Sequence, residues 1–261
     1  MAVPRDDMGY PVDVPGPVAR VVSLVPSLTE AIACTRPEVL VGATDWCSHP
    51  PGLAVARVRG TKNPDRAAVA ALRPDLVVAN KEENRALDVR RLREAGIPVW
   101  VTVTESVPQA LASLERLVTT ALDRPVPGWL AAAARLWAGP PPAARARVAV
   151  PVWRDPWMVV GARTFTGDLV GRLGLANAFA DGPGRYPRVA LADIERAGVD
   201  LVLLPDEPYP FSGDDGPEAF GRVPTALVSG RLLTWYGPSL IEAHARLRGL
   251  PGAAAGPRPP R

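Results

Sequence analysis

The chain has 261 residues, 47% of them hydrophobic, which is enough apolar material for one large domain or two small ones. The formal net charge is +3 and the charges are mixed along the chain, so the sequence contains no basic run of the kind that binds nucleic acid. Two cysteines exclude a disulfide framework, and no apolar run approaches the roughly 18 residues that a membrane-spanning helix needs.

The N-terminal segment 1–17 lacks the pattern of a secretory signal. It holds several prolines together with Arg5, Asp6, Asp7 and Asp13, and no apolar stretch follows a basic start. We therefore expect a soluble, cytoplasmic protein with no membrane insertion and no nucleic-acid partner.

The first half of the chain alternates short apolar runs with helical patterns. The run 21–25 is typical of a strand buried on both faces of a parallel sheet. Ser27 and Glu30 have the spacing of a capping box, which predicts that a helix begins at Ser27. The predicted strands are 21–25, 40–43, 76–79 and 98–103, and the predicted helices after the first are 65–72, 87–95 and 107–122.

The second half repeats this alternation after a Pro/Gly-rich break at 124–128. We interpret the next helix, 129–138, as a connection between two units. The strands predicted beyond it are 148–152, 201–204, 225–228 and 232–234, and the helices are 167–173, 191–197 and 239–247.

This order predicts an α/β fold of two parallel-sheet lobes joined by a connecting helix, with a ligand cleft between the lobes. The expected division is an N-terminal lobe at 18–122, a connecting helix with linkers at 123–146, a C-terminal lobe at 147–248 and a disordered tail at 249–261.

Two similar phrases, 74–83 and 199–208, each place acidic residues directly after a buried strand. Ligands of parallel sheets bind at the carboxyl ends of strands, so these ends are the expected site. Aromatic residues and both lysines of the chain also fall in predicted strand-end loops. The predicted ligand-binding residues are Trp46, His49, Lys62, Lys81, Glu82, Glu83, Trp157, Tyr186, Asp206, Trp235 and Tyr236.

Each residue type also has a plainer interpretation. Tryptophans mostly pack loops onto a core, and carboxylates often cap helices. His49 near Cys47 is a weak metal pattern, and we expect neither a metal site nor a catalytic residue. The chain lacks G-x-G-x-x-G, P-loop and G-x-S-x-G motifs. An enzyme using Glu83 or Asp206 as general base, and a regulatory module that binds a protein, are the alternatives to a binding protein.

Several segments together resemble the class III substrate-binding proteins, the family of vitamin B12 and iron-siderophore receptors. They are RVVSLVPSLTE at 20–30, VGATDW at 41–46, LRPDLVV at 72–78 and FTGDLVGRLG at 165–174. The resemblance covers roughly 18–248. It implies two α/β lobes with a helical backbone and, as the ligand, a corrinoid such as cobalamin or another metal chelate such as an iron chelate, with no covalent cofactor.

The resemblance also bears on individual residues. Trp46, Lys62, Tyr186 and Trp235 fall at or near positions where relatives contact a corrinoid. Family members use one glutamate per lobe to dock on an ABC permease, and Ala67 and Ala192 occupy those places here. The family is typically extracytoplasmic, so these two alanines and the missing secretory signal are departures from its pattern. The departures predict a cytoplasmic member that does not dock on a transporter in the usual way.

Overall fold

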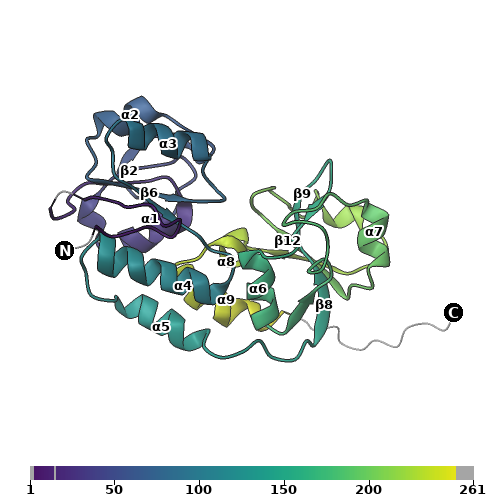
Figure 1. Ribbon diagram of the computed structural model, residues 1–261. Helices are drawn as coiled ribbons and strands as arrows, with labels where there is room; N and C mark the ends of the chain where they lie inside the picture. Colours follow the sequence, from purple (N-terminus) through teal and green to yellow (C-terminus); the bar gives the residue numbers. More distant parts are fainter. Residues whose placement is uncertain (1–2, 15, 251–261) are drawn as a thin grey trace, which may run out of the picture. The chain divides into compact units, whose positions relative to one another are not determined.

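The computed structural model describes residues 3–14 and 16–250. It divides the chain into two compact units (Figure 1). The first unit takes the chain up to Thr104, then Pro108–Arg135 and Tyr236–Pro238, and the second takes Glu105–Val107, Leu136–Trp235 and the chain from Ser239. The tail predicted to be disordered, 249–261, lies outside the described residues from 251 onward.

The first unit is built on a five-stranded sheet in the order β3-β2-β1-β6-β7, with every pair of neighbours parallel. All residues of β6 and β7 are buried, as expected for strands covered on both faces. A separate short hairpin, β4–β5, is antiparallel. The strands are β1 Val21–Ser23, β2 Leu40–Ala43, β3 Ala56–Arg57, β4 Arg59–Gly60, β5 Asn63–Pro64, β6 Leu76–Asn80 and β7 Val99–Thr102.

Helices follow the strands of the first unit. They are α1 Pro26–Ala33, the 3-10 turn η1 Pro37–Val39, α2 Arg66–Ala71, α3 Ala86–Glu94, α4 Val107–Arg116 with its π-helical continuation η2 Leu117–Ala121, and α5 Gly128–Leu136. The helix predicted at 129–138 is α5, which belongs to the first unit apart from its last residue.

The predicted capping box at Ser27 does not form. Helix α1 begins one residue earlier, at Pro26, and its N-cap Val25 makes no side-chain cap bond. Proline in the first helical turn has its φ already set for a helix and needs no backbone donor, so it starts the helix without a polar cap.

The second unit contains a four-stranded parallel sheet in the order β11-β8-β12-β13. A short antiparallel pair, β9–β10, accompanies it. The strands are β8 Ala146–Ala149, β9 Pro151–Trp153, β10 Met158–Val159, β11 Leu175–Asn177, β12 Leu201–Pro205 and β13 Thr225–Val228, and the helices are α6 Phe165–Arg172, α7 Leu191–Arg196, η3 Pro217–Ala219, α8 Gly230–Thr234 and α9 Ser239–Leu247. Two parallel sheets with helices between their strands confirm the predicted α/β class.

The strand predicted at 232–234 is wrong, because these residues form helix α8. The Asp206 carboxylate accepts a hydrogen bond from the Gly230 amide at 2.6 Å, which fixes the first turn. Gly230 also lies directly on Glu207, since an added Cβ would come within 2.8 Å of that residue's backbone nitrogen. These contacts join residues far apart in sequence, so a short apolar run could not reveal the helix.

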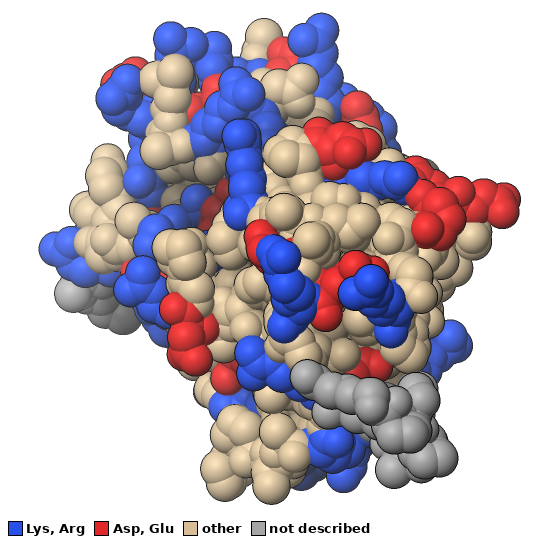
Figure 2. Space-filling model, turned by 90° about the vertical axis from the view of Figure 1, so that its right-hand side faces the viewer, with Lys and Arg blue, Asp and Glu red and all other residues tan. Residues whose placement is uncertain are grey.

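The surface carries charges of both signs. Figure 2 shows both basic and acidic side chains on the face drawn, as the mixed charge of the sequence predicts. Across residues 3–14 and 16–250, none of the helices has both the length and the apolar character required to cross a bilayer.

Candidate ligand-binding surfaces at the strand ends

The parallel strands of the first unit bring several predicted residues to one edge of the sheet. Trp46 follows β2, whereas Lys81, Glu82 and Glu83 follow β6, and strand β1 lies between β2 and β6 in the sheet. We call Trp46, Lys62 and Lys81–Glu83 the first strand-end surface. Its most prominent member is Trp46, whose side chain is 69% exposed.

The β4–β5 hairpin links the two ends of this surface. A Cβ added at Gly60 would lie 3.4 Å from the Trp46 indole nitrogen and 2.5 Å from the Asn63 side-chain oxygen, so a glycine lets the hairpin approach both. From the hairpin turn, the Lys62 ammonium donates to the Glu82 carbonyl. The indole and the acids after β6 therefore belong to one continuous surface.

Two buried asparagines hold the loop after β6 in place. The Asn80 side chain accepts from the Glu82 amide at 2.8 Å and donates to the Thr104 hydroxyl at 3.2 Å. The Asn84 side chain accepts from the Asn80 amide at 2.8 Å and donates to the Thr61 carbonyl at 2.9 Å. Because buried amides are costly to leave unsatisfied, this network fixes the backbone under the exposed side chains.

Glu83 is tied to a residue 153 positions later. The Tyr236 hydroxyl donates to the Glu83 carboxylate at 3.2 Å. Tyr236 is only 3% exposed, and burial, reinforced by the nearby Glu83 charge, raises the pKa of its hydroxyl well above the ordinary value. Thr102 and Thr104 complete its hydrogen bonding. Tyr236 therefore supports the first strand-end surface from beneath.

His49 and Cys47 lie beside this surface with different surroundings. The Cys47 sulfur is buried between the Thr29 and Thr44 hydroxyls at 3.0 and 3.1 Å, and burial raises its pKa. His49 is half-buried, with its Nδ1 3.1 Å from the Ser48 hydroxyl. A buried, protonated thiol is a poor metal ligand, so this pair does not favour a metal site.

In the second unit, Trp157 packs in an aromatic cluster. Its ring stacks on Phe211 with centroids 5.9 Å apart, meets Phe220 edge-on at 5.3 Å, and lies 5.6 Å from the Arg154 guanidinium. Tyr186, by contrast, is exposed. The plainer interpretation of a packing tryptophan therefore describes much of what Trp157 does here.

The remaining predicted residues of the second unit surround helix α8. Asp206 caps it through the Gly230 amide. Trp235 is buried directly after it, with its ring 5.9 Å from the Arg231 guanidinium and a hydrogen bond to the Glu207 carboxylate. Asp206 is exposed and Trp235 is not, so the acid is the more accessible of the two.

The Glu207 carboxylate, next to Asp206, is partly buried. Burial raises its pKa above the ordinary value of about 4.5, a hydrogen bond with Trp235 opposes this, and the Asp206 charge adds to it. One of its oxygens, Oε1, is buried without a hydrogen-bond partner.

Replacing Glu207 with glutamine is expected to change the pH dependence of stability. A carboxyl whose pKa is raised by folding destabilises the folded protein as pH rises through that pKa, because ionisation is easier in the unfolded chain. The stability of the Glu207→Gln variant relative to wild type should therefore rise from pH 4 to pH 7, measured by urea denaturation. Glu218→Gln is the matched control with the opposite sign, since a hydrogen bond from Arg154 lowers the pKa of Glu218. Equal pH slopes for the two variants would contradict the assignment.

Sequence reasoning did not select the buried residues that hold these surfaces. Asn80 ends the apolar run of β6, and Thr102 ends that of β7. A polar residue at the end of a buried parallel strand is a usable signal for residues that support a site, because ligands bind at the carboxyl ends of such strands. Among the described residues, no group of three His, Cys, Asp or Glu side chains is arranged to hold a metal ion.

Comparison with known proteins places this geometry in context. No family model matches the chain. The vitamin B12-binding protein of Pectobacterium carotovorum subsp. carotovorum (strain PC1) is 25% identical over 198 residues, covering 72% of each chain. The vitamin B12-binding protein of Vibrio parahaemolyticus (serotype O3:K6) is 25% identical over 186 residues, covering 68% of this chain and 67% of its own.

Solved structures of binding proteins have a similar fold. The periplasmic vitamin B12 binding protein BtuF of Vibrio cholerae has a TM-score of 0.69 and 16% identity over 89% of this chain and 96% of its own. The periplasmic heme-binding protein BhuT, in complex with two hemes, has a TM-score of 0.74 and 24% identity over 88% of this chain and 96% of its own. These relatives are binding proteins and not enzymes, and the chain has the α/β fold of the class III periplasmic binding proteins.

Proposed function

We propose that the protein is a non-catalytic binding protein for a cobalamin-like corrinoid, which lies against the first strand-end surface. The observation that carries the proposal is the exposed Trp46 in the loop after strand β2. An indole that is 69% exposed offers a flat apolar face to a flat ligand. Its loop is held by Arg57, which donates to the carbonyls of Thr44 and Cys47 at 2.9 and 3.0 Å.

The charges beside Trp46 favour a corrinoid over haem. The surface presents the exposed lysines Lys62 and Lys81 together with the half-buried acids Glu82 and Glu83. A corrin ring has a rim of amide side chains, which both donate and accept hydrogen bonds, so donors and acceptors are both useful. Haem has two carboxylates, which the two acids repel and the two lysines attract, so the mixed charge gives haem no net attraction, whereas an amide rim can use both kinds of group.

Haem and iron chelates are the competing ligands. The likeness to a protein solved with two hemes supports a metal chelate in general as much as a corrinoid. Purified protein titrated separately with cyanocobalamin, haem and a ferric siderophore, followed by visible absorbance and tryptophan fluorescence, tests the proposal. Saturation by cyanocobalamin at micromolar concentration is the expected result. Saturation by haem alone, or by no ligand, overturns it.

Trp46→Ala is expected to weaken cyanocobalamin binding about 10- to 100-fold, or about 1.4–2.8 kcal/mol, because an exposed aromatic anchor is removed. The free energy of unfolding should barely change, since the side chain is exposed. Val126→Ala is the matched control, an exposed apolar side chain of the same unit that follows a helix and not a strand. Isothermal titration calorimetry on the three proteins gives the comparison, and equal affinities would remove Trp46 from the site.

Two alanines bear on where the protein works and whether it docks on a permease. The structure places Ala67 on α2 and Ala192 on α7, both exposed, where the family resemblance expects docking glutamates. We propose that the protein works in the cytoplasm and does not dock on a permease through these positions. Fractionation of cells that express the complete gene tests the location, and recovery in the periplasm would reverse it.

A further inference from the structure

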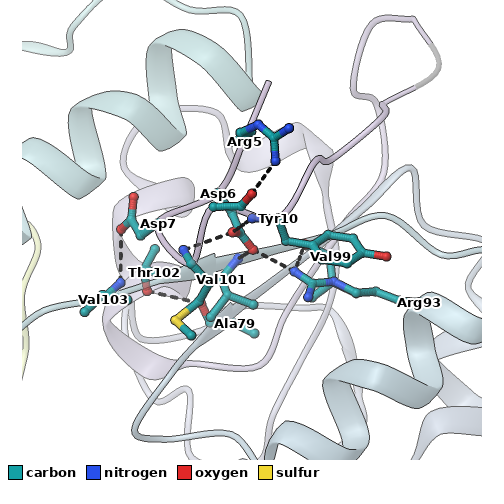
Figure 3. Close-up of polar contacts among 12 residues, drawn as sticks. Arg5, Asp6, Asp7, Tyr10, Ala79, Arg93, Val99, Val101, Thr102 and Val103 are labelled. Atoms are coloured by element: carbon teal, nitrogen blue, oxygen red, sulfur yellow. Dashed lines mark hydrogen bonds and ion pairs between the residues drawn. The ribbon is translucent and has the colours of Figure 1, made fainter. Parts of the chain in front are cut away.

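The segment Arg5–Tyr10, which we call the edge strap, lies along strand β7 (Figure 3). β7 is an outermost strand of the first sheet. In a parallel strand, alternate residues direct their backbone polar groups to opposite sides. The Thr102 carbonyl accepts from Lys81, on the side of β6. Val99, Val101 and Val103 therefore direct theirs to the open side.

Val99, Val101 and Val103 each have a hydrogen-bond partner on that open side, and most of these partners belong to the strap. The Val101 amide donates to the Asp6 carboxylate at 3.2 Å, and the Val101 carbonyl accepts from the Asp7 amide at 3.1 Å. The Val103 amide donates to the Asp7 carboxylate at 3.0 Å. An outermost strand would otherwise present these groups to any passing strand.

The strap is itself held by two helices. Asp6 pairs with Arg93 at 2.6 Å, and Arg93 also donates to the Val99 carbonyl at 2.9 Å. Asp7 pairs with Arg116 at 2.5 Å and accepts from the Ser113 hydroxyl. These contacts come from α3 and α4, so both helices beside β7 fix the two carboxylates.

The use of side-chain carboxylates has a specific consequence. A strand added to β7 would satisfy the edge but present a new row of unpaired amides and carbonyls on its far side. Carboxylates accept from the edge amides and offer no such row, so the ladder ends there.

We propose that the edge strap is a built-in cap that keeps β7 from pairing with a strand of a second copy of this chain. The inference is independent of the ligand, because it rests only on contacts within the first unit.

Two variants test the cap against the unaltered chain of 261 residues. One lacks residues 1–12, and the other is Asp7→Ala, with the exposed Asp13→Ala as its matched control. Hydrogen exchange of the Val101 and Val103 amides is compared with that of Val22 at the sheet centre, and light scattering gives the mass over a range of concentrations.

In Asp7→Ala, the Val103 amide should exchange on the order of tenfold faster relative to Val22, whereas Asp13→Ala should match wild type. The truncated protein should form dimers or larger species as concentration rises. A folded, monomeric truncated protein whose two amides stay protected overturns the proposal. If truncation unfolds the protein, unchanged relative exchange in Asp7→Ala overturns it instead.

Discussion

Replacing Asp6 with alanine should lower the free energy of unfolding by about 3–5 kcal/mol, because it leaves the Arg93 charge largely buried without its partner. The Asp6 side chain is fully buried and lies 2.6 Å from Arg93. It also accepts from the amides of Met8, Tyr10 and Val101 at 3.0, 2.9 and 3.2 Å. One substitution therefore leaves several donors unsatisfied at once.

Urea denaturation followed by circular dichroism measures this loss. Asp13→Ala serves as the control, because Asp13 is an exposed carboxylate of the same N-terminal segment and should cost less than about 0.5 kcal/mol. A double-mutant cycle with Arg93→Ala should give a coupling energy of about 1–3 kcal/mol, since the two side chains are in direct contact. Additive losses would mean that the ion pair contributes nothing beyond its separate contacts.

The parallel sheets could be predicted because their sequence signal is local. Runs such as LVVAN in β6 and LVLLP in β12 are buried at every position and apolar apart from the terminal Asn80, as a strand covered on both faces requires. The helix α8 could not be predicted in the same way. Its Leu232 and Leu233 form an equally apolar but shorter run, and the hydrogen bond to its first turn comes from Asp206, 24 positions earlier.

The candidate site could be predicted in part. Acids and aromatic residues after strands do gather at the sheet edges, and Trp46 is exposed there. Sequence could not separate exposed from buried members. Trp235 and Tyr236 look alike as strand-end aromatics, yet both are buried by contacts with residues far away in the chain. Pairwise contacts of that range leave no periodic pattern to detect.

The edge strap shows a further limit of local reasoning. In the sequence alone, Asp6 and Asp7 indicate only that the N-terminal segment is not a secretory signal. Their role depends on Val101 and Val103, some 95 residues later. Carboxylates on backbone amides of an outermost strand follow from topology, because which strand is outermost is decided by the order of the whole sheet.

Tyr236 offers the second large effect, and two substitutions separate its ring from its hydroxyl. Tyr236→Ala should cost about 3–5 kcal/mol, since it leaves a cavity where a nearly fully buried ring was packed. Tyr236→Phe keeps the ring and should cost about 1–3 kcal/mol, because Glu83, Thr102 and Thr104 lose a shared hydrogen-bond partner. Urea denaturation at neutral pH gives both values.

Tyr186→Phe is the matched control, because Tyr186 is exposed and loss of its hydroxyl should change stability by less than about 0.5 kcal/mol. The comparison also tests the role of Tyr236. A residue that supports Glu83 from within the first unit must lower stability in the absence of any ligand when its hydroxyl is removed. A Tyr236→Phe protein as stable as wild type would contradict that role.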